Sequence, residues 1–383
     1  MQLADFFKKY VYPVAVISGS IIGVGFFSLP YIALKSGTWI MLLYFFILTG
    51  VVLTIHLIFA EISLKTPDFK RFPGFVKYYF GKYAQAFSLF STILGYYGVL
   101  LIYLIVGSEF LANILQPYFG GSNTLYAIIY FLFASCVIWF GIKAVSKIEL
   151  LVLSILFVSV IFIFAKGILQ SGFSNIFLFS PDFSSNGFGL KSVSNLFLPY
   201  GAILFSLWGA GLIPEAEEME ADNKKSIKKI VLTATLIPAI FYVFFTFLIL
   251  SITGLQTTEF ALTGLKDFLG ENLSLIVFFI GIASTITACV AQGLTLKKVF
   301  AYDLKVKNWQ AFIMTCSVPM ILYLLGLKSF ISLISFIGGV LLGIDGIFIL
   351  LMYKKIGGKR IIIYPLSFIF LLGIVYQVFY FFI

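Results

Sequence analysis

The sequence predicts an all-α integral membrane protein, and three observations lead to that fold class. Hydrophobic residues make up 61% of the 383 residues, and only 11% are charged. A soluble domain carries about 25% charged residues, so this chain lacks the polar groups to cover a surface in water. Its apolar runs are continuous and about 18–28 residues long, as in membrane-spanning helices, and do not alternate as barrel strands do. The composition excludes a soluble enzyme, a nucleic-acid-binding protein and a disordered protein.

Eleven apolar runs are long enough to cross a bilayer, and we number them as spans 1 to 11. Their approximate bounds are residues 11–34, 39–64, 85–115, 124–142, 148–170, 193–216, 228–254, 272–299, 309–327, 329–352 and 361–383. We expect residues 1–383 to form one integral membrane domain with no soluble module.

The positive charges divide unevenly between the two sides of the membrane. When the loops are assigned alternately, 21 of the 26 Lys and Arg residues fall on the side of the N-terminus. The other side holds five: Lys35, Lys166, Lys191, Lys266 and Lys328. The positive-inside rule then predicts a multi-pass plasma-membrane protein with a cytoplasmic N-terminus and, because the span count is odd, an outer C-terminus. The net charge of +10 indicates orientation and no nucleic-acid partner.

The sequence offers little for enzymatic or metal chemistry. The three cysteines, Cys136, Cys289 and Cys316, lie inside apolar runs, and their spacing indicates neither a disulfide framework nor a metal site. The chain has one histidine, no HExxH motif and no phosphate-binding loop. We therefore predict no enzyme activity and no cofactor.

Spans 1 and 6 are each interrupted by glycine. Span 1 contains the segment Ser18-Gly-Ser-Ile-Ile-Gly-Val-Gly25 before Pro30, and span 6 contains Ser206-Leu-Trp-Gly-Ala-Gly211 before Pro214. Glycine in a helix costs about 1 kcal/mol relative to alanine, so we predict that both spans are broken. The alternative is that these small residues let neighbouring helices pack closely.

The two interrupted spans occupy corresponding positions if the chain is an inverted repeat of five plus five helices. Repeat one would cover residues 11–170, repeat two residues 193–352, and an extra helix residues 361–383. Paired breaks of this kind mark the midplane binding site of transporters, because broken helices expose backbone groups and helix dipoles.

Several motifs, in their order along the chain, resemble those of the amino acid/auxin permease family of the APC superfamily. Residues 17–25 with Leu29 and Pro30 resemble the G-x-x-I-G-x-G…P signature that opens this family. Further matches are Glu61 before Thr66-Pro67, Gly81 to Gln85, Gly107 to Ala112, Phe205 to Pro214, Ser284-Thr285 and Gly293 to Asp303. The resemblance covers most of the chain and is nearest to the bacterial aromatic (tyrosine/tryptophan) permeases.

The resemblance implies a leucine-transporter-like (LeuT-like) fold of two inverted five-helix repeats plus an eleventh helix. It also implies a secondary active transporter (symporter) that imports a neutral, hydrophobic or aromatic amino acid by alternating access, coupled to H⁺ or Na⁺. The expected partners are this substrate and the lipid bilayer, with the protein a monomer or weak oligomer. The alternative is a receptor of the same fold that binds an amino acid without moving it.

We expect the two breaks to hold the substrate mainly through backbone groups. N–H groups around Gly23 and Gly25 would bind the α-carboxylate, because a helix N-terminus attracts anions and glycine allows close approach. Carbonyls near Ser18 and in the span 6 break would bind the α-ammonium. Trp208 and the span 3 tyrosines Tyr96, Tyr97 and Tyr103 would line the side-chain pocket. The candidate substrate-binding residues are Ser18, Gly19, Ser20, Gly23, Gly25, Tyr97, Phe205, Ser206, Trp208 and Gly209.

Two kinds of residue are candidates for ion coupling. The hydroxyls of Ser284 and Thr285 in span 8, with Ser18 in span 1, suit a hard cation, unless they bond back to their own helices. Glu109 and Asp345 lie inside spans, where ionisable groups are expensive, and could carry a proton. The alternative for both carboxylates is a structural hydrogen bond.

Three further polar features have simpler interpretations. The sole histidine, His56, is expected to be neutral, packed and hydrogen-bonded. Glu61, at the end of span 2, is expected to pair with cytoplasmic basic residues. The acidic run from Glu215 to Asp222 is expected to form a solvated helix face, with a cytoplasmic gate as the alternative.

Overall fold

The computed structural model describes residues 7–67, 70–140, 154–155, 157–162, 190–219 and 226–382. All regular structure in these ranges is helical. Most of predicted span 5 and nearly all of the outer loop before span 6 lie outside the described residues.

The first half of the chain contains eight helical segments between residues 7 and 140, and residues 157–162 are also helical. They are η1 (Phe7–Val11), α2 (Tyr12–Ile21), η2 (Gly25–Ser28), α3 (Leu29–Ser36), α4 (Thr38–Lys65), α5 (Phe72–Phe80), α6 (Lys82–Phe119) and α7 (Asn123–Phe140). The short helix α5 before span 3 was not predicted. Gly81, with a φ of 85°, ends α5 and directly precedes α6, a conformation that glycine adopts without strain.

The helices of the second half begin at residue 190, and those up to residue 298 are given first. They are α9 (Leu190–Leu207), η3 (Ala210–Leu212), α10 (Ile213–Met219), α11 (Ile227–Thr253), η4 (Gly254–Gln256), η5 (Thr263–Leu265), α12 (Lys266–Leu269) and α13 (Glu271–Lys298). The remainder are η6 (Val299–Asp303), α14 (Asn308–Leu324), α15 (Phe330–Phe336), η7 (Ile337–Leu341), α16 (Leu342–Lys355) and α17 (Arg360–Phe382). Both η6 and η7 are π-helical.

The described residues contain eight helices that are long and apolar enough to cross a membrane. A ninth span results if the bent pair Lys9–Ile21 and Gly25–Ser36 is counted as one. Helix α14, with 17 residues, corresponds to predicted span 9. The all-helical membrane architecture is therefore confirmed, whereas the total of eleven spans stays a prediction.

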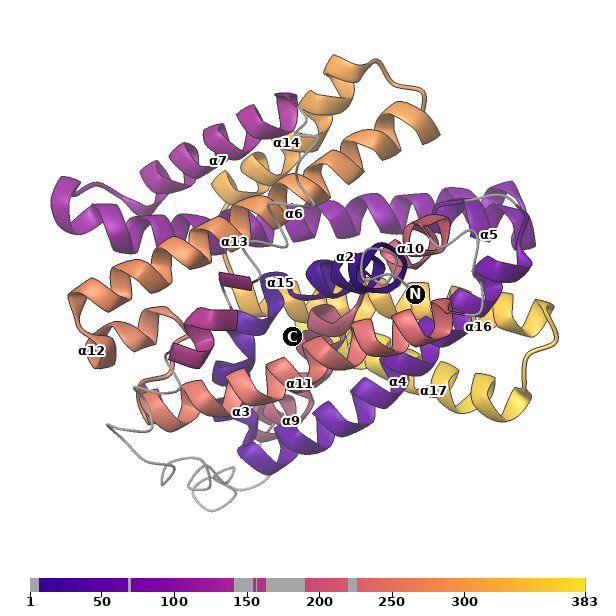
Figure 1. Ribbon diagram of the computed structural model, residues 1–383, viewed down its shortest axis with the longest axis horizontal. Helices are drawn as coiled ribbons and strands as arrows, with labels where there is room; N and C mark the ends of the chain where they lie inside the picture. Colours follow the sequence, from indigo (N-terminus) through magenta and orange to yellow (C-terminus); the bar gives the residue numbers. More distant parts are fainter. Residues whose placement is uncertain are drawn as a thin grey trace.

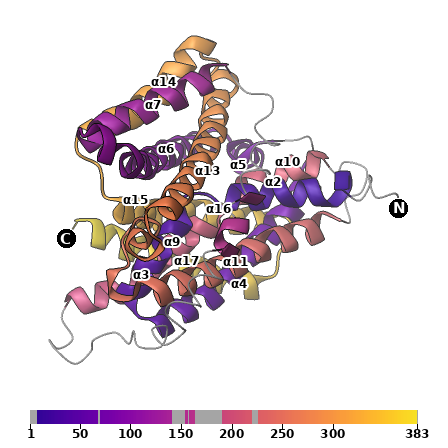
Figure 2. The ribbon, with the colours of Figure 1, turned by 60° about the vertical axis from the view of Figure 1, so that its left-hand side comes forward.

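The spans form two groups that face each other. In one group α6 runs along α13, and α7 lies beside α14 (Figures 1 and 2). In the other group α4 packs along α11, and α2 and α10 lie against them. Helices at corresponding places in the two halves of the chain are thus neighbours. The breaks of spans 1 and 6 belong to the second group and are directed at the first.

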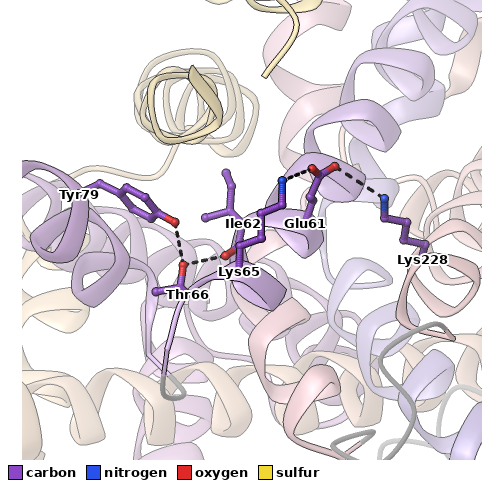
Figure 3. A network of polar contacts seen from close by, with 6 residues as sticks. All are labelled: Glu61, Ile62, Lys65, Thr66, Tyr79 and Lys228. Carbon is purple, nitrogen blue, oxygen red and sulfur yellow. Dashed lines mark hydrogen bonds and ion pairs between the residues drawn. The ribbon is translucent and has the colours of Figure 1, made fainter. Parts of the chain in front are cut away.

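The cytoplasmic end predicted for α4 is tied to its neighbours by polar contacts (Figure 3). The Glu61 carboxylate pairs with Lys65 Nζ at 2.8 Å and with Lys228 Nζ of α11 at 3.6 Å. One turn later, Thr66 Oγ1 lies 3.0 Å from Tyr79 Oη of α5. Exposed ion pairs contribute at most about 1 kcal/mol each, so this network orients the helix end more than it stabilises the fold.

Helix α9 passes the π-helix η7 at backbone contact. A Cβ atom on Gly338 would lie 1.8 Å from the Gly201 carbonyl oxygen, and one on Gly201 would lie 2.4 Å from the Ser335 carbonyl oxygen. Helices in lipid gain little from burying apolar side chains against each other, so close backbone approach is a main source of their association. This contact fixes the outer half of span 6 against span 10.

We predict that Gly338→Ala destabilises the protein, because overpacking a tight contact costs about 1–3 kcal/mol. The measurement is the thermal unfolding midpoint of detergent-purified protein. Gly50→Ala on α4 is the control, since no heavy atom lies within 4 Å of its added Cβ. Equal midpoints for the two variants would contradict the proposed backbone contact.

Candidate functional site

The break of span 1 lies where the sequence predicts it. Helix α2 ends at Ile21, and Ile22 leaves the helical conformation with a ψ of 68°. The chain becomes helical again at Gly25, and α3 follows with Pro30 in its first turn. The two segments meet at an angle of 45°. Gly25 therefore begins a new helical segment, whose first N–H groups have no partner within that segment.

The break of span 6 follows the same plan. Helix α9 ends at Leu207, the residues Trp208 and Gly209 are not helical, and a 3₁₀ turn leads into α10. Pro214 lies in the first turn of α10, where a missing N–H is tolerated. The regular helix is thus interrupted in both spans, which is compatible with the two predicted breaks.

The two breaks lie against each other. A Cβ on Gly25 would lie 2.5 Å from Ser206 Oγ and 2.8 Å from the Phe205 ring. A Cβ on Gly209 would lie 2.6 Å from the Ile21 side chain. The glycines therefore serve both interpretations of the sequence, because they interrupt the helices and also allow the interruptions to touch.

A tyrosine from span 7 bonds to both breaks. Tyr242 of α11 is fully buried, and its Oη lies 2.6 Å from the Ile21 carbonyl oxygen and 3.2 Å from the Ser206 carbonyl oxygen. Each of these carbonyls lies at the end of a helical segment, where intrahelical partners run out. Tyr242 thereby joins the two interrupted helices through one hydroxyl group.

His56 of α4 caps the break of span 6. The Gly209 N–H donates to His56 Nε2 at 3.1 Å, and His56 Nδ1 lies 2.9 Å from Thr235 Oγ1. Thr235 donates its own hydroxyl proton to the Val231 carbonyl. Thr235 must therefore accept from Nδ1–H, which leaves Nε2 as an acceptor and the ring neutral. The expectation of a packed, neutral, hydrogen-bonded histidine agrees with this geometry.

A cavity of about 1050 Å³ opens beside the two breaks. Its walls come from α2 and the span 1 break, the span 6 break with α10, α6, α13, η7 and α16. At one end it reaches charged side chains, namely Lys70, Arg71, Glu215, Glu218 and Lys298. Glu215, Glu218 and Lys298 are exposed, so this end communicates with the surface.

Most of the predicted substrate-binding residues line this cavity. They are Gly19, Ser20, Gly23, Gly25, Phe205, Ser206, Trp208 and Gly209. Trp208 stands between His56 and Phe370, with ring centroids 5.9 Å and 6.4 Å away, and remains partly open to the cavity. Of the predicted ion-coupling residues, Asp345 lines the same cavity.

Two predicted substrate contacts lie elsewhere. Ser18 is buried outside the cavity walls; its Oγ donates to the Ala234 carbonyl, and its own carbonyl accepts the Ile22 N–H. Tyr97 points away to α14, where its hydroxyl donates to the Met314 carbonyl at 3.0 Å. The span 3 tyrosines that do form the wall are Tyr96 and Tyr103. A helix turns about 100° per residue, so Tyr96 and Tyr97 cannot share one face.

The other predicted coupling residues also lie outside the cavity walls. Thr285 Oγ1 donates to the Ile282 carbonyl, which is the helix-bonded alternative, and Ser284 is buried beside it. Glu109 accepts from Asn113 Nδ2 at 3.3 Å and from Asn123 Nδ2 at 3.2 Å, at the connection from α6 to α7. The structure thus favours the structural alternative for Glu109.

The acidic run after span 6 is only partly a solvated face. Glu217 is 6% exposed and accepts a hydrogen bond from the Ser63 hydroxyl of α4. The neighbouring Glu215 and Glu218 are exposed and face the cavity mouth. At the same mouth Arg71 lies 3.5 Å from Asp303, which links the start of α5 to the end of η6. The run therefore anchors α10 to α4 as well as meeting solvent.

Sequence reasoning missed several residues of this site. Tyr242 is one of 21 tyrosines and carries no local motif. The α13 wall, which includes Ala288, Gln292 and Thr295, follows the predicted Ser284-Thr285 pair by one to three turns. Its residues show a helical spacing, but many other faces of the apolar spans do so as well.

A helical membrane protein whose two interrupted helices meet beside a large cavity has the architecture of a transporter and not of an enzyme. A model of the tryptophan/tyrosine permease family matches residues 7–360. The chain belongs to this family and is a multi-pass membrane protein. A comparison with curated proteins found no match.

Solved structures place the fold independently. The chain is similar to MhsT in complex with L-phenylalanine, with a TM-score of 0.72, 14% identity, and coverage of 96% of this chain and 98% of that one. It is also similar to Mhp1, a nucleobase-cation-symport-1 family transporter in a closed conformation with bromovinylhydantoin bound. That match has a TM-score of 0.67, 11% identity, and coverage of 89% and 77%. The leucine-transporter-like fold is confirmed.

We predict that His56→Leu destabilises the protein by about 1–3 kcal/mol, because it leaves the buried Gly209 N–H without an acceptor. The amide oxygen of glutamine can occupy the place of Nε2, so His56→Gln should recover most of the loss. Thermal midpoints of the two variants and the wild type test this. If leucine and glutamine behave alike, the cap has no energetic role.

Proposed function

We propose that this protein imports an aromatic amino acid across the plasma membrane, by alternating access and coupled to a cation gradient. The observation that carries the proposal is the meeting of the two breaks beside a cavity lined by aromatic side chains. Membership of the tryptophan/tyrosine permease family supports the substrate class, and so does the solved complex of MhsT, a protein of similar fold, with L-phenylalanine. A receptor that binds without transport is the alternative that the uptake experiment below excludes or favours.

The seat proposed for the substrate backbone is the pair of breaks. The helical segment that begins at Gly25 directs N–H groups and a positive dipole end toward an incoming carboxylate. The Ile21 and Ser206 carbonyls, which Tyr242 contacts in this structure, are the nearest acceptors for an ammonium group. Few charged side chains are then needed to bind a zwitterion.

The seat proposed for the substrate side chain is the aromatic part of the cavity. Trp208 and Phe205 border it from span 6, and Tyr96 and Tyr103 border it from α6. Aromatic rings prefer edge-to-face or offset contacts with one another, each worth about 0.5–1.5 kcal/mol beyond the buried area. Such a wall favours an aromatic side chain over a small or charged one.

The proposed orientation makes this conformation open to the cytoplasm. The charged end of the cavity belongs to segments that the positive-inside rule assigns to the cytoplasmic side. Beyond the break, Phe26 and Phe27 are fully buried and pack on Phe245 and Phe110, with ring centroids 4.8 Å and 5.2 Å apart. This aromatic cluster would close the outer path, and its opening would be the outward-facing state.

We predict that protein reconstituted in liposomes accumulates labelled tryptophan, tyrosine or phenylalanine under an imposed cation gradient. Unlabelled aromatic amino acids should compete better than alanine, lysine or glutamate. Saturable binding without uptake under either a proton or a sodium gradient would favour the receptor alternative. Neither binding nor uptake of any of the twenty amino acids would refute the proposed function.

The proposed seat predicts that two glycines of the same cavity differ in their effect on substrate affinity. Gly25→Ala places a methyl group 2.5 Å from Ser206 Oγ, so it should lower substrate affinity about tenfold or more by displacing the touching breaks. Gly211→Ala is the matched control, because no heavy atom lies within 4 Å of its added Cβ. Ligand-induced thermal shifts measure both. Similar affinities for the two variants would place the substrate elsewhere.

A further inference from the structure

Helix α6 runs antiparallel to the segment formed by η7 and α16, and the two form a seam in the middle of the membrane region, called the α6–α16 seam below. A Cβ on Gly98 would lie 2.5 Å from Ile337 Cδ1, and one on Gly95 would lie 3.9 Å from Leu341 Cδ1. Further along, the rings of Phe87 and Phe348 lie 6.1 Å apart. These three pairs fix the register of the two helices, with the chain directions opposed.

The same register places Ser91 and Thr92 of α6 opposite Asp345 of α16. All three residues line the cavity described above. Ser88 lies on the same face of α6, about one helical turn before Ser91, and is fully buried. Asp345 lies ten residues before the end of α16 at Lys355, or about 15 Å along the helix. One carboxylate and three hydroxyl groups therefore lie along one stretch of this seam, well inside the membrane region.

Each of these four side chains has a buried oxygen atom without a hydrogen-bond partner. The atoms are Asp345 Oδ1, Ser88 Oγ, Ser91 Oγ and Thr92 Oγ1. Ser91 is only 4% exposed. Serine and threonine in membrane helices usually donate to a carbonyl one turn earlier, as Thr54 and Thr315 do in this protein. Four unpartnered oxygens on one seam are therefore a departure from the local rule.

Asp345 also has no ion-pair partner within 4.0 Å among the described residues. The charged or titratable side chains that share its cavity are Tyr96 and Tyr103 on α6, Lys70 and Arg71 before α5, Glu215 and Glu218 on α10, and Lys298 on α13. His56 on α4 uses both ring nitrogens elsewhere. A carboxylate in a low-dielectric region is stable only if a positive charge neutralises it.

We propose that Asp345 and the hydroxyls of Ser88, Ser91 and Thr92 form the binding site of the coupling cation, on the seam between α6 and α16. A carboxylate with hydroxyl oxygens is the donor set that a hard monovalent cation prefers, and it equally suits a proton held by the carboxylate and shared with a hydroxyl. The π-helix η7 ends four residues before Asp345, and π-helical turns occur often at functional sites.

The site is separate from the proposed substrate seat but opens into the same cavity. The breaks bind the substrate from one side of the cavity, whereas Asp345 belongs to the helix that forms another wall. Binding of a cation there would change the charge and packing of the α6–α16 seam, beside Tyr96 on the same cavity wall. The role of this cation in coupling rests on the proposed transport function. Binding of the cation does not, because it can be measured without transport.

The test compares Asp345→Asn with Glu109→Gln in proteoliposomes and in detergent. Both changes remove one carboxylate charge from a membrane helix, but Glu109 lies outside the cavity walls and is bonded to Asn113 and Asn123. We expect Asp345→Asn to keep amino acid binding and substrate exchange while gradient-driven accumulation falls about tenfold or more, since coupling factors are about 5- to 150-fold. Glu109→Gln should accumulate substrate as the wild type does.

Two further arms identify the cation and protect against misfolding. If the cation is sodium, NaCl but not KCl should raise the thermal midpoint of the wild type and not that of Asp345→Asn; if it is a proton, lowering the pH should do so instead. The double variant Ser91→Ala, Thr92→Val removes the hydroxyls alone and should weaken the same cation response.

The proposal would be overturned if the Asp345→Asn variant accumulated the amino acid to the same level as the wild type. A folded Asp345→Asn protein that loses amino acid binding together with accumulation would also overturn it, since the two sites would then not be separate. If the wild type transports no amino acid, the proposed function fails, and the cation-dependent midpoint still decides whether Asp345 binds a cation.

Discussion

The structure depends on one constraint, which is that backbone polar groups inside a membrane need partners from the protein itself. An unbroken helix meets this requirement internally, and most of the spans do so. Spans 1 and 6 do not, because each loses its intrahelical bonds near the middle. Two side chains from the neighbouring spans supply part of the replacement: Tyr242 donates toward the Ile21 and Ser206 carbonyls, and His56 accepts the Gly209 N–H. The spans that carry these side chains, α4 and α11, pack along each other.

This arrangement explains why the protein has few charged residues in its spans. A binding site made from broken helices uses dipoles and backbone groups that every sequence possesses, so its selectivity comes from the surrounding side chains. The cavity accordingly combines apolar and aromatic walls with a mouth of charged residues. The charged side chains of the cavity lie at its mouth, except for Asp345 on the α6–α16 seam.

Some of the fold and the site could be predicted from the sequence, and the physical reason is locality. Apolar runs identify spans because lipid acts on each segment independently. The breaks could be predicted because Gly23, Gly25 and Gly209 act on their own helices. The face of α6 could not be predicted: Tyr96, Tyr97 and Tyr103 were all expected in the pocket, whereas Tyr97 points to α14 and only the other two line the cavity. The rotation of a helix that is apolar all round is decided by its neighbours.

The same limit applies to the polar residues. Glu109 and Asp345 look alike in the sequence, as single carboxylates inside apolar spans. One lies between two asparagines at a helix connection, and the other lies opposite hydroxyls inside a cavity. The neighbours of each carboxylate are set by segments distant in the sequence or by the register of two packed helices. Neither kind of neighbour can be predicted from one sequence.

The contact of Tyr242 with both breaks leaves fewer hydrogen-bond donors than acceptors at this point. A phenol has one proton, and two carbonyl oxygens compete for it, at 2.6 Å for Ile21 and 3.2 Å for Ser206. The shorter contact takes the proton, so the Ser206 oxygen is the less satisfied of the two. An ammonium group brings three protons to the same place. A ligand of that kind would complete a set of bonds that the protein alone leaves one donor short.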